Sequence, residues 1–180
     1  MKIAIFGGYF DPIHKAHVEI VKKLFEELQI DKVIIIPTNV SYYKKNKALL
    51  SYDQRLDICK IAINNDKYLC DKNIEISDIE RDIKNDEGYA HTLIKIKNIY
   101  PNDDIYTVIG SDSYNYIDTW RSYEKILELS KLIVITRPEN EIRKDLNIPY
   151  IKLDMNEDIS STKIRNEILE FILSKLEQNE

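Results

Sequence analysis

The chain has 180 residues, of which 43% are hydrophobic, so it is long enough and apolar enough to form one domain around one core. Its net charge of −5 and its pI near 5.4 argue against a nucleic-acid-binding surface, which is usually basic. Two cysteines are too few for a disulfide scaffold and fit no zinc pattern. No stretch resembles a signal peptide or a membrane span. We therefore expect a cytoplasmic protein that binds neither nucleic acid nor a membrane, with homo-oligomer formation left open.

The first half of the chain alternates apolar runs of strand length with segments of helical spacing. Residues 3–6 end at two glycines and residues 33–36 end at Pro37, which predicts two strands buried in a parallel sheet. Between them, an amphipathic helix is predicted by apolar residues spaced three and four apart, namely Val21, Leu24, Phe25 and Leu28. A capping box at Ser51 predicts the start of a second helix, whose apolar face carries Leu56, Cys59 and Ile63.

The second half continues this alternation. Further strands are predicted over residues 74–76, 105–109, 132–136 and 150–153. Helices are predicted before Pro101, where Leu93, Ile96 and Tyr100 share one face, and over residues 123–130 and 161–176. Strands that alternate with helices imply βαβ crossovers. We therefore expect one α/β domain over residues 1–180, built on a doubly wound parallel sheet and ending in a C-terminal helix.

Residues 7–17 carry the first chemical signal. Gly7 and Gly8 follow the first strand, where they let the backbone turn sharply and approach a ligand. The next helix begins within residues 12–15, and its amino end presents N–H groups and a partial positive charge to an anion. His14 and His17 share one face of that helix, so both could hydrogen-bond phosphate oxygens. Structural histidines and a two-histidine metal site stay open as alternatives, although no third metal ligand is evident nearby.

Two later segments are also suited to ligand binding. Residues 159–165 place hydroxyl groups before a helix and Arg165 one turn inside it, which suits an anion, although the residues alone favour a capped surface helix. Gly110 and Asp112 follow a predicted strand, where a carboxylate can reach a ribose hydroxyl or a metal. Trp120 could stack on an aromatic ligand. A capping aspartate and a partly buried tryptophan explain these residues equally well.

Two of these segments together resemble the nucleotidylyltransferase superfamily. Residues 7–17 are similar to its first signature, and residues 160–165 are similar to its C-terminal motif. One motif follows the first strand and the other precedes the last helix, which is the order found in the superfamily. The resemblance implies a Rossmann-like nucleotidyltransferase fold, and it narrows the phosphate interpretation to the triphosphate of ATP.

Within that superfamily, nearly the whole chain resembles the bacterial nicotinate-nucleotide adenylyltransferase family. The similar stretches include residues 36–38, 51–56, 109–112, 119–121 and 134–138. The chain differs from the family at Tyr9, where Thr is usual, and at Ala16, where Gly is usual. Of the family's Pro-Pro-His-Lys loop, residues 41–44 keep only Lys44, and the Tyr-Thr-x-x-Thr-Leu pattern is reduced around Thr92. All of these differences except the one at Ala16 fall on the acceptor side.

The resemblance implies adenylyl transfer from ATP to nicotinate mononucleotide, which gives deamido-NAD and pyrophosphate in NAD biosynthesis. Mg²⁺ would accompany the ATP and be held mostly by the nucleotide and water, with no metal ligands assigned in the protein. The implied catalytic residues are His14, His17, Lys44 and Arg165. The implied ATP-binding residues are Gly7, Gly8, Phe10, Gly110, Asp112, Ser160, Ser161 and Thr162. The implied acceptor-binding residues are Tyr9, Thr92, Trp120, Arg121 and Arg137.

Alternatives in two further classes stay open. The same chemistry could use nicotinamide mononucleotide or pantetheine phosphate as acceptor, or CTP as donor. The chain could also be a nucleotide-binding sensor without catalytic activity. A panel of acceptors with ATP or CTP, scored by pyrophosphate release, separates these hypotheses.

Overall fold

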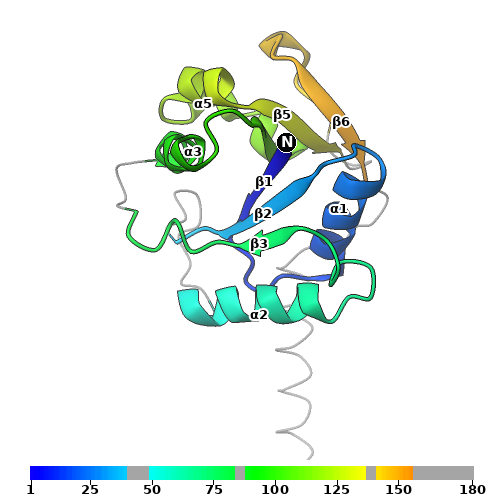
Figure 1. Ribbon diagram of the computed structural model, residues 1–180. Coiled ribbons are helices and arrows are strands. Elements are labelled where there is room, and N and C mark those ends of the chain that lie inside the picture. Colours follow the sequence, from blue (N-terminus) through cyan, green and yellow to red (C-terminus); the bar gives the residue numbers. More distant parts are fainter. Residues whose placement is uncertain (40–48, 84–87, 137–140, 156–180) are drawn as a thin grey trace, which may run out of the picture.

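The computed structural model describes residues 1–39, 49–83, 88–136 and 141–155, which form a layered α/β structure (Figure 1). Its strands are β1 (Lys2–Gly8), β2 (Lys32–Pro37), β3 (Ile74–Ile76), β4 (Asp104–Gly110), β5 (Lys131–Thr136) and β6 (Tyr150–Asp154). They form one six-stranded sheet in the order β3-β2-β1-β4-β5-β6, and every neighbouring pair is parallel. The predicted doubly wound parallel sheet is therefore confirmed.

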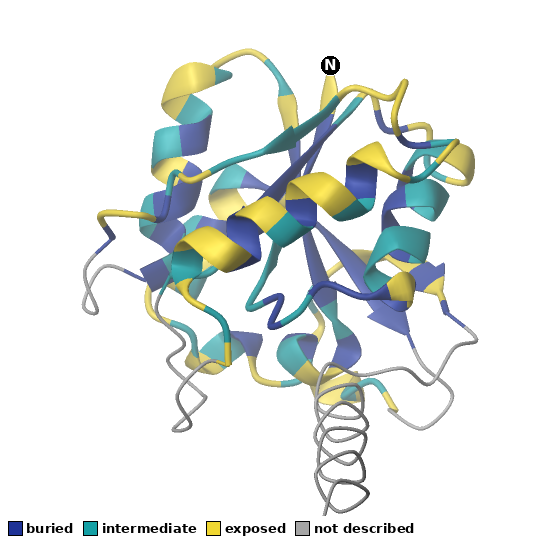
Figure 2. Cartoon of the chain, turned by 90° about the horizontal axis from the view of Figure 1, so that it is seen from below, coloured by how far each residue is buried: buried dark blue, intermediate teal, exposed yellow. Residues whose placement is uncertain are grey.

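Helices cover both faces of this sheet. They are α1 (Lys15–Glu26), α2 (Tyr52–Asn64), α3 (Gly88–Ile99), α4 (Ser111–Tyr114) and α5 (Tyr123–Leu129), with short 3-10 turns η1 (Ile117–Thr119) and η2 (Lys144–Leu146). Apolar side chains of α1 and α2 pack in one cluster with alternate residues of β1 and β2, whereas α3 and α5 pack on the residues between them. Figure 2 shows helices that are exposed on their outer side and buried toward the sheet. None of the described helices is both long and apolar enough to cross a membrane.

The winding direction of the sheet changes between β1 and β4. From β1 the chain passes outward through β2 to β3, then returns to β4 on the other side of β1 and continues to β5 and β6. In an open parallel sheet, the loops that follow the two strands at such a point diverge and leave a crevice at the carboxyl edge. The loop after β1 leads to His14 and His17, and the segment after β4 carries Asp112 and Trp120. Both are segments for which the sequence predicts ligand binding.

The structure also shows where the sequence pattern was imprecise. The first helix begins at Lys15 and ends at Glu26, so Leu28 lies beyond it. Strand β6 was predicted over residues 150–153 and extends to Asp154, and it is mostly exposed because it is an edge of the sheet. The short helices α4, η1 and η2 have too few residues to show an apolar period, and the sequence did not indicate them. The predicted helix over residues 161–176 lies outside the described residues.

Candidate active site

The loop between β1 and α1 is shaped by a close approach of Phe10 to Gly8. A Cβ atom on Gly8 would lie 2.8 Å from the Phe10 ring, so any larger residue would displace that ring. Phe10 itself has a φ of 44°, in the left-handed region that non-glycine residues rarely adopt. Its ring packs edge-on against Phe6 at 5.3 Å and His17 at 5.0 Å between centroids. The Phe10 ring is therefore a packing element of this loop, buried between Phe6 and His17.

His14 and His17 lie together at the start of α1, as their spacing predicted. Their rings are stacked with centroids 3.7 Å apart. The backbone N–H of His14 donates to Nδ1 of His17 at 3.2 Å, which forms half of a capping box. Because Nδ1 accepts that bond, the neutral His17 ring carries its proton on Nε2, which is then the donor nitrogen.

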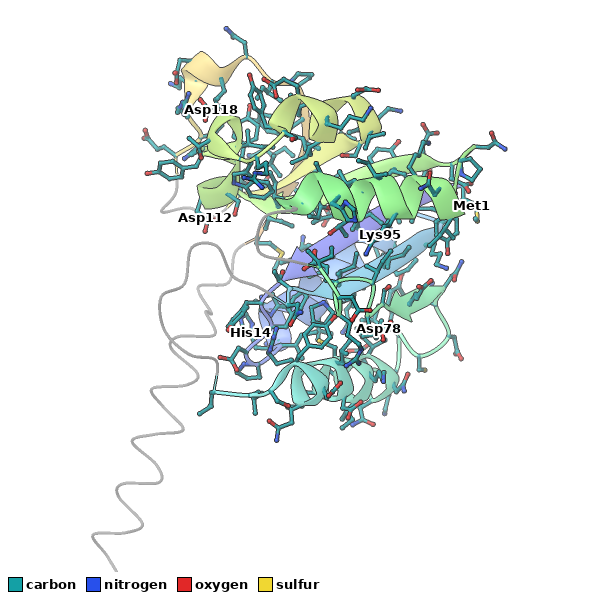
Figure 3. The ribbon with its side chains drawn as sticks, turned by 90° about the vertical axis from the view of Figure 1, so that its left-hand side faces the viewer. Met1, His14, Asp78, Lys95, Asp112 and Asp118 are labelled. Atoms are coloured by element: carbon teal, nitrogen blue, oxygen red, sulfur yellow. The ribbon has the colours of Figure 1, made fainter. Side chains whose placement is uncertain are left out.

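The amino end of α1 supplies positive potential at the same place. The helix is 12 residues long and has no acidic side chain in its first turn. Its backbone dipole is therefore not neutralised by a carboxylate of its own first turn, and the N–H groups there favour an anion. Figure 3 places His14 and Asp112 at one edge of the molecule and Met1 at the opposite edge, so both lie at the carboxyl ends of the strands.

Asp11 secures the other side of this loop. It is only 3% exposed, and its two carboxylate oxygens accept hydrogen bonds from the backbone N–H groups of Leu49 and Leu50, both at 3.0 Å. These bonds join the β1–α1 loop to the residues that immediately precede α2. Sequence reasoning missed this role because the partners are backbone groups more than thirty residues away, which leave no pattern.

Arg55 of α2 is a second buried group that the sequence analysis did not assign to the site. Its Nη1 donates to the carbonyl oxygens of Tyr9 at 2.7 Å and Thr38 at 2.8 Å. Its guanidinium also lies over the Tyr9 ring, 4.5 Å from the centroid. Tyr9, predicted to contact the acceptor, is thus held by Arg55 through both its backbone and its ring.

The loop after β4 forms the other wall. Gly110 caps α4, and a Cβ atom on Gly110 would collide with Oδ1 of Asp112, so the carboxylate folds back over the strand end. Asp112 and Arg121 are exposed, whereas Trp120 is half-buried. These three predicted site residues therefore lie at or near the surface beyond β4, where a ligand can reach them.

The first turn of α3 packs beneath Trp120. The Tyr89 ring meets the Trp120 ring edge-on, with centroids 5.9 Å apart, and it would lie 3.8 Å from a Cβ on Gly7. The Tyr89 hydroxyl lies 3.3 Å from Oγ1 of Thr107, and its burial raises the pKa of that hydroxyl. Gly88 has a φ of 69° and packs against the side chain of Arg121. The turn thereby connects the end of β1 with the Trp120 loop.

Thr92 is completely buried rather than exposed to the crevice. Its hydroxyl donates to Oε1 of Glu80 at 2.9 Å, and the other Glu80 oxygen accepts from the backbone N–H of Asn39 at 3.3 Å. Burial raises the pKa of the Glu80 carboxyl, and the Thr92 and Asn39 bonds partly oppose that shift. The Thr92 hydroxyl is thus engaged by Glu80 in this structure. A contact between Thr92 and the acceptor stays a prediction.

The remaining predicted site residues lie outside the described part of the chain. They are Lys44, Arg137, Ser160, Ser161, Thr162 and Arg165. Within the described ranges, no group of three or more His, Cys, Asp or Glu side chains is arranged to hold a metal ion. The structure brings three features together at the switch point, where the winding direction of the sheet changes between β1 and β4. They are the histidine pair, the amino end of α1 and the two flanking loops.

Comparisons with known proteins show the family of this chain. The Cytidylyltransferase-like family matches residues 5–167. A protein of Fusobacterium nucleatum named probable nicotinate-nucleotide adenylyltransferase is 38% identical over 176 residues, with 93% of this chain and 88% of the relative covered. A protein of Campylobacter fetus with the same name is 37% identical over 168 residues, with 93% of this chain and 87% of the relative covered.

A solved structure shares the fold. The Plasmodium falciparum nicotinic acid mononucleotide adenylyltransferase complexed with NaAD superposes with a TM-score of 0.77 at 24% identity, over 92% of this chain and 82% of that chain. Sequence and fold thus agree along most of the chain. The chain belongs to the nicotinate-nucleotide adenylyltransferase family.

Proposed function

We propose that this protein transfers the adenylyl group of ATP to nicotinate mononucleotide, forming deamido-NAD and pyrophosphate. The observation that carries this proposal is the stacked His14–His17 pair at the amino end of α1, at the switch point of the sheet. The choice of acceptor is supported by relatives that are named probable nicotinate-nucleotide adenylyltransferase and match this chain along nearly its whole length.

The reaction needs two polyanions held in line rather than a covalent intermediate. An oxygen of the acceptor phosphate attacks the α-phosphorus of ATP, the bond to the β-phosphate oxygen breaks, and pyrophosphate leaves. Negative charge that grows on the phosphate oxygens is stabilised by donors fixed in advance. Nε2 of His17, oriented by the bond from the His14 backbone to Nδ1, is such a donor, and the N–H groups of α1 add to it.

The two loops are proposed to contact different groups of the two substrates. In our proposal the backbone around Gly8 and Phe10 cradles the triphosphate, and Asp112 reaches the ribose of ATP. Trp120 stacks on the pyridine ring of the acceptor, with Arg121 beside it. Lys44, Arg137 and residues 160–165 are proposed as further phosphate and acceptor contacts, on the resemblance of their motifs alone.

Mg²⁺ is proposed as the accompanying cation. The nitrogen donors of the histidine pair suit phosphate better than a hard cation, and Asp112 is the exposed carboxylate at the end of β4. Mg²⁺ prefers phosphate oxygens and water and keeps several water ligands. When bound with ATP it would neutralise phosphate charge, while the residues of this chain orient the nucleotide.

The test is an acceptor panel with the purified protein, ATP or CTP, and Mg²⁺, measured by pyrophosphate release. We expect turnover with ATP and nicotinate mononucleotide, and much slower turnover with nicotinamide mononucleotide or pantetheine phosphate. Preference for another acceptor would move the chain to another branch of the superfamily. ATP binding without turnover of any acceptor would make it a sensor and would overturn the proposal.

A further inference from the structure

Arg55 is a buried cation without an acidic partner in the described part of the chain. The residue is 2% exposed, and among the residues that the structure describes it forms no ion pair with a carboxylate. Its Nε is also buried without a hydrogen-bond acceptor there. Because a buried charge without a counterion destabilises a fold, its presence in α2 needs an explanation other than packing.

The two carbonyl groups that Arg55 binds identify its place in the architecture. Tyr9 follows the last residue of β1 and Thr38 follows the last residue of β2. The backbone N–H of Thr38 donates to the carbonyl of Gly8 at 2.8 Å, the last bond between these strands. Arg55 bridges the two chains immediately beyond that bond, through a single nitrogen 2.7 Å from one oxygen and 2.8 Å from the other. It therefore fixes where the loop of the histidine pair leaves the sheet.

The guanidinium of Arg55 also lies over two aromatic rings. Its central carbon lies 4.5 Å from the centroid of the Tyr9 ring and 5.4 Å from that of Tyr52. A planar guanidinium can stack on aromatic rings while its edge donates to carbonyls, which a lysine ammonium cannot reproduce. Burial raises the pKa of the Tyr52 hydroxyl to about 12, so this neighbour stays neutral at physiological pH. Arg55 thus constrains both the backbone and the side chain of Tyr9.

We infer that Arg55 is a positioning residue for adenylyl transfer, an inference that rests on the proposed function. By holding Tyr9 against the end of β2, it sets the geometry of the loop over Gly8 and Phe10 that would cradle the triphosphate. Its positive charge, which no carboxylate of the described residues pairs with, lies under that loop and adds to the potential of the α1 amino end. Tyr9, which stands where Thr is usual in the family, is the partner through which Arg55 acts.

The test compares three variants with the wild-type protein. Arg55→Met removes the charge and both bonds, Arg55→Lys keeps the charge, and Tyr9→Thr removes one aromatic ring. We expect Arg55→Met to lower kcat by at least ~10-fold, because small displacements of a positioned group reduce rates steeply. Arg55→Lys is expected to recover part of that loss, and Tyr9→Thr is expected to make Arg55→Lys less harmful in the double variant.

Binding of a non-hydrolysable ATP analogue, measured by calorimetry, separates this inference from the proposed function. If the wild-type protein turns over no acceptor, the proposed function fails, and Arg55 is then judged on analogue affinity alone. We expect that affinity to fall about tenfold in Arg55→Met and less in Arg55→Lys. If Arg55→Met does not fold, the same comparison is made between Arg55→Lys, Tyr9→Thr and their double variant.

Arg143 offers a matched control. Its guanidinium also donates to a backbone carbonyl, that of Asn115 at 2.8 Å, but it pairs with Asp118, away from His14 (Figure 3). Arg143→Met is expected to leave kcat within about twofold of the wild-type value. A lower melting temperature in the Arg55 variants with unchanged kcat and unchanged analogue affinity would show a purely structural role and overturn the inference.

Discussion

The loops after β1 and β4 follow neighbouring strands, yet they are held in different ways. In the loop after β1, Phe10 and Asp11 are buried, and Arg55 and the histidine cap add polar bonds to fixed backbone groups. In the loop after β4, Asp112 is exposed and Trp120 rests edge-on against one ring, Tyr89. The β1 loop is thus fixed by charged and polar contacts, whereas in the β4 loop such contacts, from Arg143, hold Asn115 and Asp118 rather than the Trp120 ring, which rests on apolar packing.

This difference matches two different physical demands. Stabilising charge on a transferring phosphoryl group requires donors whose positions are fixed before the reaction. Recognising an aromatic ring requires a flat apolar surface, which tolerates small shifts. We therefore expect changes in the β1 loop to act on turnover and stability, and changes at Trp120 of the β4 loop to act on acceptor affinity.

The largest effect is expected at His17. We predict that His17→Ala lowers kcat by ~10²-fold or more with little loss of fold, as for removal of one transition-state donor. His17→Asn can restore an acceptor near the Nδ1 position, and so the cap on the His14 N–H, without a donor at Nε2. His17→Gln can place an amide donor near Nε2.

Steady-state kinetics and melting temperatures of these three variants test the donor role. The Asn variant should keep its stability and stay slow, whereas the Gln variant should recover part of the rate. Near-normal turnover in His17→Ala, or full recovery in His17→Asn, would contradict the role given to Nε2.

Asp11 should give the next largest effect, on stability. Asp11→Ala leaves the N–H groups of Leu49 and Leu50 without their carboxylate, and bonds to charged groups contribute about 2 kcal/mol. We predict a loss of about 2 kcal/mol in the free energy of unfolding, measured in urea. Asp31→Ala is the control, since this exposed carboxylate also accepts a backbone N–H, from Lys2 at 2.7 Å. Equal losses in both variants would mean that burial of Asp11 adds nothing.

A change at Trp120 should show most clearly that the two loops have different roles. We predict that Trp120→Ala raises KM for the acceptor about tenfold, because one lost aromatic stack is worth roughly 1–1.5 kcal/mol. KM for ATP should stay within about twofold, and Trp120→Phe should recover most of the affinity. Tyr116→Ala removes an exposed aromatic ring nearby and should change neither constant. A parallel rise in KM for ATP would show that Trp120 does not act on the acceptor alone.

The fold was largely predictable because its strands and long helices have clear periods. All six strands were expected from apolar runs, and the capping box at Ser51 was found where the second helix begins. The strand order was not predictable in detail, because which strands pair depends on contacts between distant residues. Helix α4 has four residues, which is too short to show a hydrophobic period.

The site was predictable where its residues are neighbours in sequence. His14 and His17 are three residues apart, and the structure stacks their rings. Arg55 and Asp11 were not found, because they act on backbone groups of distant segments, and such groups have no residue identity to detect. The engagement of Thr92 by Glu80 was missed for a related reason: a buried pair between two elements shows no spacing.

Glu80 connects α3 with the segment beyond β2, and it offers the smallest predicted effect. It accepts from Thr92 of α3 and from the backbone N–H of Asn39 beyond β2. Burial raises the pKa of this carboxyl above its ordinary value of 4.5 in the folded protein, so the folded state binds its proton more tightly than the unfolded chain. Its contribution should therefore fall as pH rises from about 4.5 through the folded-state pKa, and then stay constant.

Urea unfolding of wild-type protein and Glu80→Gln between pH 4.5 and pH 8 measures this contribution. Because the variant cannot ionise at this position, the wild-type protein should lose stability relative to it as pH rises through that window. Glu26→Gln, a change at an exposed carboxylate of α1, controls for the loss of one charge. A difference between wild type and Glu80→Gln that does not vary with pH would mean that Glu80 is not desolvated in solution. The contact between α3 and the segment beyond β2 would then be looser than the structure indicates.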